Sequence, residues 1–250
     1  MNKLKIFSVV LLSILTLSLS AKDYQASLFG VKSEGITLNT KSIQKAVDFI
    51  SEKGGGRLVF YVGRYLTGSI QLKSNVTIEL KEGAVLVATP SVYDYFGVNG
   101  TKALITAEGQ ENIGITGKGV IEGQGSAVLE QINLQIQKGY LTGTAAEASP
   151  ALVAMNNCRN ILIEGFNMAD ACGNVQVYTG CNNLSINGVS IKSTSIKGTK
   201  GLLLAGCDGV KLSNIFFETS GTEISSAGTS KNVTVVNCKN STGKKLQAKN

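Results

Sequence analysis

Apolar and polar residues alternate in short runs along most of this chain, and the runs recur at a regular spacing. One phrase, an alternating apolar run followed by a small-residue turn and an Asn or Gly, begins at residues 103, 151, 174, 200 and 223. Its last four copies lie 23, 26 and 23 residues apart. A repeat of this length is typical of a solenoid, in which each turn stacks on the one before.

A second alternating run follows each phrase, as in residues 160–168 (NILIEGFNM) and 183–191 (NLSINGVSI). Each turn of the coil is therefore expected to hold three short strands joined by tight Gly and Asn corners. Successive turns would stack about 4.8 Å apart. We predict an all-β fold, a right-handed parallel β-helix, which forms a single domain over residues 22–250.

This register stacks like residues into columns. A corner column contains Asn75, Asn112, Asn160, Asn183 and Asn232, with Gly209 after Asp208 standing between the last two. Asn and Gly tolerate a left-handed backbone, and stacked Asn amides can bond to one another, so the predicted role of this column is structural. Another column contains Cys158, Cys181 and Cys207. Thiols in a line do not converge tetrahedrally as zinc requires, so we predict buried thiols and no metal site.

Two stretches have helical periodicity instead. Residues 40–53 carry one apolar face, formed by Ile43, Ala46, Val47 and Ile50. Asn39 or Thr40 can cap the start of this helix, and Gly54, Gly55 and Gly56 follow its end. This helix is expected to cover the N-terminal end of the coil, where bare strand edges would invite association. The second stretch, residues 126–139, is predicted to leave the coil between two turns and to wall a groove.

The N-terminus predicts export. Residues 1–21 combine Lys3 and Lys5, an apolar stretch from Ile6 to Leu19, and a small-residue exit, which is the pattern of a cleavable signal peptide. The apolar stretch is short for a membrane span, no Cys lies near the cleavage point to accept a lipid, and no membrane insertion is expected. We therefore expect a periplasmic or secreted protein.

Composition narrows the chemistry. The formal charge of +7 falls to +5 without Lys3 and Lys5, which favours acidic partners such as uronate polysaccharides, although a solvated lysine surface explains the charge equally simply. The lysines are scattered and no aromatic stacking set accompanies them, so nucleic acid is not an expected partner.

The chain has no His, which excludes His-based triads and an imidazole base. Five Cys, an odd number, leave at least one thiol unpaired within the chain. No cofactor is called for, and a monomer is the default expectation.

The stretch from Leu28 to Gly125 resembles the N-terminal half of the polygalacturonase family of glycoside hydrolases, which are pectin-degrading right-handed β-helices. The likeness is carried by residues 29–31 (FGV), 35–46 (GITLNTKSIQKA), 54–56 (GGG), 63–68 (GRYLTG), 72–77 (LKSNVT), 82–86 (EGAVL), 93–95 (YDY) and 112–125 (NIGITGKGVIEGQG). The resemblance implies the same coil and a pectic, galacturonate-containing polysaccharide as partner.

The second half keeps the coil of this family but not its catalytic residues. Family enzymes carry Asn-Thr-Asp, then Asp-Asp one turn later, then Gly-His-Gly, then an Arg-Ile-Lys segment. The first three fall here on residues 198–200 (GTK), 222–223 (TE) and 243–245 (GKK), and the fourth has no counterpart before Asn250. The positions that match the family's catalytic motifs are therefore Lys200, Thr222, Glu223 and Lys244, of which only Glu223 is a carboxylate and a catalytic candidate.

Inverting hydrolysis needs a carboxylic acid and a carboxylate about 6.5–9.5 Å apart, and Glu223 alone cannot supply both. We also expect Lys200 and Lys244 to hold Glu223 ionised, which is wrong for a general acid. The favoured hypothesis is an exported, polygalacturonase-like protein that binds pectic chains with lost or much weakened hydrolysis. Lys192, Lys197 and Lys245 are added as candidate contacts for galacturonate carboxylates.

Three alternatives stay open. The acid and base of an active glycosidase could have moved to other carboxylates, such as Asp170, Asp208 or Glu218. A β-eliminating uronate lyase could use Lys200 or Lys244 as its base if the pKa of that lysine were lowered. A structural or adhesive coil would need no sugar site. The final stretch, Lys244 to Asn250, lacks an apolar run that would close the coil.

Overall fold

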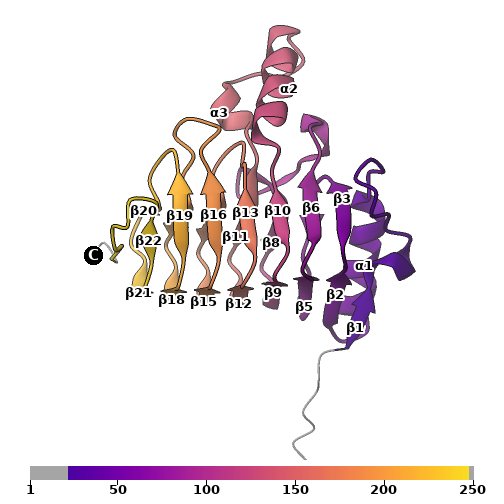
Figure 1. The fold of residues 1–250 in the computed structure, drawn as a ribbon, viewed down its shortest axis with the longest axis horizontal. Coiled ribbons are helices and arrows are strands. Elements are labelled where there is room, and N and C mark those ends of the chain that lie inside the picture. The colour runs from indigo at the N-terminus through magenta and orange to yellow at the C-terminus, as the bar shows by residue number, and fades with distance from the viewer. Residues whose placement is uncertain (1–21, 248–250) are drawn as a thin grey trace, which may run out of the picture.

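The structure, a computed structural model, describes residues 22–247 and shows a coil of three parallel sheets (Figure 1). The predicted signal peptide, residues 1–21, lies outside the described residues. Each turn contributes one strand to each sheet, as the repeat predicts. Successive turns pair in parallel and in register, for example Ile161 with Leu184 and Leu184 with Val210.

The first sheet, sheet A, has eight strands. They are β1 Asp23–Gln25, β2 Gly56–Phe60, β5 Val76–Leu80, β9 Glu111–Gly117, β12 Arg159–Glu164, β15 Asn182–Asn187, β18 Asp208–Ser213 and β21 Lys231–Val236. Sheet B has seven strands. They are β3 Gly63–Thr67, β6 Ala84–Ala88, β10 Val120–Glu122, β13 Asn167–Ala169, β16 Ser190–Ser193, β19 Phe216–Thr219 and β22 Lys239–Asn240.

Sheet C completes each turn and is important for the candidate site. Its strands along the coil are β4 Ile70–Gln71, β8 Thr101–Glu108, β11 Ala151–Asn156, β14 Gln176–Thr179, β17 Leu202–Ala205 and β20 Ile224–Ala227. A short strand, β7 Gly97–Val98, pairs antiparallel with β8. Two 3-10 turns, η1 Ala26–Phe29 and η2 Val92–Asp94, lie in the connections.

The alternating pattern fills the coil with one continuous apolar core. In β15, Leu184 and Ile186 point inward and are fully buried, while the intervening Ser185 is partly exposed. The aromatic side chains Phe166, Tyr178 and Phe217 are also fully buried. Because the connection between parallel strands of one sheet is right-handed in nearly all proteins, this stacking gives the predicted right-handed parallel β-helix.

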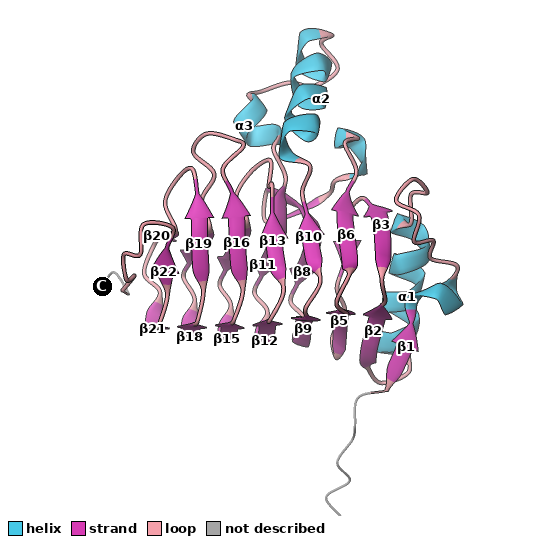
Figure 2. Cartoon of the chain, viewed as in Figure 1, coloured by secondary structure: helices cyan, strands magenta, loops and turns pink. Residues whose placement is uncertain are grey.

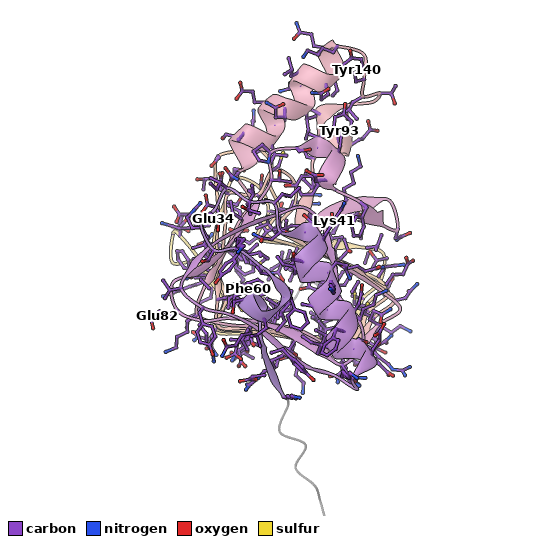
Figure 3. The ribbon with its side chains drawn as sticks, turned by 90° about the vertical axis from the view of Figure 1, so that its right-hand side faces the viewer. Glu34, Lys41, Phe60, Glu82, Tyr93 and Tyr140 are labelled. Carbon is purple, nitrogen blue, oxygen red and sulfur yellow. The ribbon has the colours of Figure 1, made fainter. Side chains whose placement is uncertain are left out.

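Helix α1, Thr40–Glu52, covers the N-terminal end of the stack, and Ile43, Ala46, Val47 and Ile50 are fully buried beneath it. Figure 3 looks onto this end, with Lys41 on the helix and Phe60 among the strands behind it. The side-chain capping hydrogen bond predicted at the start of this helix is wrong. The Asn39 side chain makes no capping bond and instead bonds Lys32, Thr37 and Leu66 backbone groups, because at 2% exposure it must satisfy the loop that surrounds it.

The predicted corner column forms a ladder of amides. Asn112 donates to Asn75, Asn160 to Asn112, and Asn183 to Asn160, with Nδ2–Oδ1 distances of 2.9, 2.9 and 2.8 Å. All of these residues have a positive φ, and Gly209 takes the same conformation where the Asn is missing. At that step Asn232 donates to Asp208 instead. The structural role predicted for this column is confirmed.

A second ladder, which the sequence analysis did not identify, runs along the next corner. Asn187 donates to Glu164 and accepts from Asn214, and Asn237 donates to Asn214. Glu164 and Asn187 share one column of the repeat, but Asn214 and Asn237 each lie one residue later, because the register partners of Asn187 on the next two rungs are Ser213 and Val236. No single column of the aligned sequence therefore indicated this ladder.

The three aligned thiols, Cys158, Cys181 and Cys207, are at most 1% exposed, and all five Cys are free. Cys181 donates to the Met155 carbonyl and Cys207 to the Tyr178 carbonyl. They fill the coil as small apolar groups, as predicted. Cys238 also lies in the main core, while Cys172 is buried elsewhere, beneath the insertion described next.

One insertion leaves the coil between β10 and β11. Helix α2, Gly125–Gln137, and the short helix α3, Ala145–Ala148, rise from the edge where sheets B and C meet (Figure 2). Val128 and Ile132 bury one face of α2 against Val92 and Cys172. Tyr93 also contacts α2, through a hydroxyl that donates to Gln135 at 2.9 Å. The predicted helical excursion is therefore present.

The C-terminal end differs from the expectation of an uncapped coil. After β22 the chain turns back, and Leu246 packs against the core while its N–H donates to the Cys238 carbonyl at 2.9 Å. Leu246 is a single apolar residue without periodicity, which explains why no pattern predicted its contact. Within residues 22–247, no helix has the length and apolar character needed to cross a bilayer.

Candidate functional site

The positions that match the family's catalytic motifs lie where the chain enters sheet C. Lys200 precedes β17, and its carbonyl accepts from Val175 at 2.9 Å. One turn later, Thr222 and Glu223 precede β20, and their carbonyls accept from Gly201 and Leu202 at 3.0 and 2.9 Å. The parallel register therefore places Lys200 and Glu223 on neighbouring rungs, as the repeat predicts.

Gly201 is required for this close stacking. A Cβ on Gly201 would lie 2.7 Å from the Glu223 carbonyl oxygen and 2.7 Å from the Phe217 ring, closer than such contacts occur in proteins. The absence of a side chain at this position thus lets the two rungs approach each other.

Glu223 does not pair with Lys200 or Lys244, the lysines expected beside it. Its Oε1 accepts a hydrogen bond from Asn240 Nδ2 at 2.7 Å, and among the described residues no lysine ammonium forms an ion pair with its carboxylate. Asn240 Oδ1 in turn accepts from the backbone N–H groups of Thr242 and Lys244. Glu223 is therefore tied to the C-terminal turn, a structural contact that sequence reasoning missed.

Four of the predicted residues line one cavity of about 340 Å³: Thr222, Glu223, Lys244 and Lys245. Its floor is the apolar interior of the last turn, including Ile224, Val233 and Leu246. Lys244 and Lys245 are exposed at its rim. The arrangement offers two ammonium groups and one carboxylate that is already hydrogen-bonded, which suits binding of an anion better than transfer of a proton.

The remaining two lysines lie elsewhere. Lys192 is on β16 in sheet B and forms an ion pair with Glu218 of β19 at 3.2 Å, so it does not join the other candidates at sheet C. Lys197 lies in the connection between β16 and β17 and lines a separate cavity beside the insertion. Only the three-dimensional structure could separate these lysines, because all of them occupy polar positions in the repeat.

The central column of outward-facing residues on sheet C consists mostly of apolar side chains. Ala154, Val177 and Leu203 pair directly across three strands, and Ser225 follows on β20. Ala154 and Val177 are at most 5% exposed and form, with Val98, Ala103 and Ala151, a cluster separate from the interior core. The next outward column contains Glu108 on β8, and its carboxylate accepts from Asn156 at 3.2 Å.

The carboxylates considered as displaced catalysts each have a structural partner on another part of the coil. Asp170, at the turn after β13, accepts from the Gly125 N–H at 3.1 Å. Asp208 begins β18 of sheet A and accepts from Asn232 at 2.7 Å, and Glu218 pairs with Lys192 on sheet B. The structure thus does not bring any of these three together with Glu223 on the face of sheet C. Across residues 22–247, no three His, Cys, Asp or Glu converge as metal ligands.

Comparison with known proteins assigns the family. The profile of Glycosyl hydrolases family 28 matches residues 59–246. An exo-poly-α-D-galacturonosidase of Dickeya chrysanthemi is 33% identical over 114 residues, which cover 39% of this chain and 19% of that protein. The chain therefore spans about a fifth of the length of this curated relative.

Two solved structures extend the comparison. A protein of Parabacteroides merdae, described as a candidate glycosyl hydrolase, is 48% identical with a TM-score of 0.88, over 92% of this chain and 100% of that one. The family 28 exopolygalacturonase of Yersinia enterocolitica has a TM-score of 0.77 at 23% identity, over 88% of this chain and 49% of that one, and so shares the fold. With three quarters of its residues matched by the profile, this chain belongs to family 28 of the glycosyl hydrolases.

Proposed function

We propose that this protein binds pectic, galacturonate-containing polysaccharide along sheet C, and that hydrolysis of the family type is lost or much weakened. One observation carries the proposal. The positions matching the family's catalytic motifs hold Lys200, Thr222, Glu223 and Lys244, and the single carboxylate is bonded to Asn240 at 2.7 Å. A second carboxylate at the separation that inverting hydrolysis requires, about 6.5–9.5 Å, is not among these residues.

Charge and surface support the binding. Lys244 and Lys245 present point charges that suit uronate carboxylates. Leu203, which is partly exposed in the outer column of sheet C, offers an apolar contact for a sugar ring, whereas Ala154 and Val177 in the same column are buried. Exposed charge pairs are individually weak, so binding should depend on several such contacts and decrease with salt.

The proposal includes export. Residues 1–21 have the signal-peptide pattern, and an extracellular or periplasmic location is where a pectic polymer would be met. Mass spectrometry of the protein recovered from the periplasm or medium of an expressing cell should give a chain that begins close to Lys22. Recovery of the full-length chain in the cytoplasm alone would refute export.

Calorimetric titration with oligogalacturonides at low and high salt tests the binding. We expect heat at low salt and a smaller signal at high salt, with little release of reducing ends from polygalacturonate. Absence of heat in both conditions would refute binding. Vigorous hydrolysis that is lost in Glu223→Gln would refute the loss of activity and restore Glu223 as a catalytic residue, whereas hydrolysis unchanged in that variant would assign the reaction to other carboxylates.

A further inference from the structure

A second cavity lies beside the insertion and is distinct from the one that contains Glu223. Its volume is about 310 Å³, and it lies between α2 and α3 on one side and the connection of residues 194–199 on the other. Leu129, Cys172 and Ile196 make its apolar lining. Its polar side chains are those of Ser149, Asn174, Lys197 and Thr199, and none of the described residues that line it is a carboxylate.

The walls of this cavity are held in place. In the connection, two hydrogen bonds fix Thr199. Its N–H donates to Ser220 Oγ at 3.1 Å, and its Oγ1 donates to the Ile196 carbonyl at 2.9 Å. On the opposite wall, Ser149 Oγ donates to the Ala145 carbonyl at 2.7 Å and receives the Cys172 thiol at 3.3 Å. The cavity is therefore preformed, which lowers the entropic cost of binding.

Two polar groups at the cavity have no partner within residues 22–247. The Asn174 side-chain amide makes no hydrogen bond there, and the exposed Lys197 ammonium makes no ion pair. Ser149 and Thr199, by contrast, are engaged with the backbone. An ammonium and an amide beside an apolar wall match one uronate unit, with its carboxylate at Lys197, a ring hydroxyl at Asn174, and the apolar ring face against Ile196 and Leu129.

The position of this cavity connects it to the proposed binding face. Asn174 immediately precedes Val175, whose N–H donates to the Lys200 carbonyl, and Gly201 donates in turn to Thr222. Asn174, Lys200 and Glu223 therefore lie at the entry to sheet C on three successive rungs, each about 4.8 Å from the next. A chain that follows the rungs toward the insertion would reach the cavity.

We propose that this cavity is a subsite that binds a single galacturonate unit of the polysaccharide, with Lys197 as its charge partner and Asn174 as its hydrogen-bonding residue. The inference rests on the proposed function, because it names an additional contact for the same ligand. It makes the insertion, which is separate from the coil's own packing, part of the binding surface.

Titration with trigalacturonate at low salt tests the subsite. Lys197→Ala should weaken binding about three- to fivefold, the range of an exposed charge pair, and Asn174→Ala should weaken it by a similar factor. Ala146→Phe, on the exposed side of α3, would put a ring into the cavity without altering charge and should weaken binding about tenfold or more. Lys211→Ala removes the same charge from the outer face of sheet A and is the matched control.

The outcomes separate this inference from the proposed function. Weakened binding in the Lys197, Asn174 and Ala146 variants, with Lys211→Ala like the wild type and unfolding midpoints unchanged, supports the subsite. If the wild type binds trigalacturonate and all three variants bind it within about twofold of the wild type, the subsite is overturned while binding along sheet C stands. Binding of the polymer without binding of trigalacturonate has the same meaning. Absence of binding to both ligands overturns the proposed function and the subsite together.

Discussion

The Asn ladder provides the sharpest test of how this coil is stabilised. Asn160 stands in the middle of the ladder, donating to Asn112 at 2.9 Å and accepting from Asn183 at 2.8 Å, with φ at 54°. Asn160→Ala would remove both hydrogen bonds and place a Cβ-bearing residue without a local hydrogen-bonding side chain in the left-handed region. Asn160→Gly would remove the same bonds but keep a residue for which this backbone is unstrained.

The magnitude follows from these two contributions. Each exposed amide bond contributes about 0.5–1 kcal/mol, and the left-handed conformation costs an alanine about 1–2 kcal/mol. Asn160→Ala should therefore lower the free energy of unfolding by about 2–4 kcal/mol, and Asn160→Gly, which loses only the two hydrogen bonds, by about 1–2 kcal/mol. The chain already contains the natural form of the control, since Gly209 occupies the same column with φ at 68°.

Urea denaturation followed by far-ultraviolet circular dichroism measures both variants, and the chain has no Trp that would serve as a fluorescent probe. Equal loss of stability in the two variants would refute the backbone argument. A loss below about 0.5 kcal/mol in both would refute any energetic role for the amide ladder, whatever its regularity.

Three further predictions concern the candidate site and the thiols. Glu223→Ala should loosen the C-terminal turn and lower stability by about 1 kcal/mol, while Glu223→Gln, which keeps an acceptor for Asn240, should unfold like the wild type; equal thermal midpoints for both would contradict the proposed role of the contact. Gly201→Ala should destabilise by about 1–3 kcal/mol, because its Cβ would overlap the next rung, and unfolding by urea within error of wild type would show that the rungs can separate. Burial raises the pKa of the Cys172 and Cys238 thiols, so the neutral form is favoured in the folded state and stability is fully present below the unfolded thiol pKa of about 8.5. Stability should then fall as pH rises above that value toward the raised folded pKa, by up to about 1.4 kcal/mol per pH unit for each thiol, and a replacement of both by Ser that leaves this slope unchanged would refute the assignment.

Much of the fold could be predicted because a solenoid repeats one local pattern. Alternation placed the strands, and the register placed Asn160 and Cys181 in their columns without knowledge of any distant contact. The same register put Lys200 and Glu223 on neighbouring rungs. Where the pattern is irregular the predictions were weaker: the cap at Asn39 was wrong in its bonds, and the packing of Leu246 was not foreseen.

The sequence by itself determined the three-strand turn, the columns inside it and the residue types at the positions that match the family's catalytic motifs, because these depend on periodicities of a few residues and on one repeat length. Only the tertiary structure decided which partner each polar side chain has. It assigned Glu223 to Asn240, paired Lys192 with Glu218 on another sheet, and brought Lys197 to the insertion. The physical reason is that hydrogen bonds and ion pairs form over a few ångströms, and those distances are set by how the turns and the insertion pack against one another.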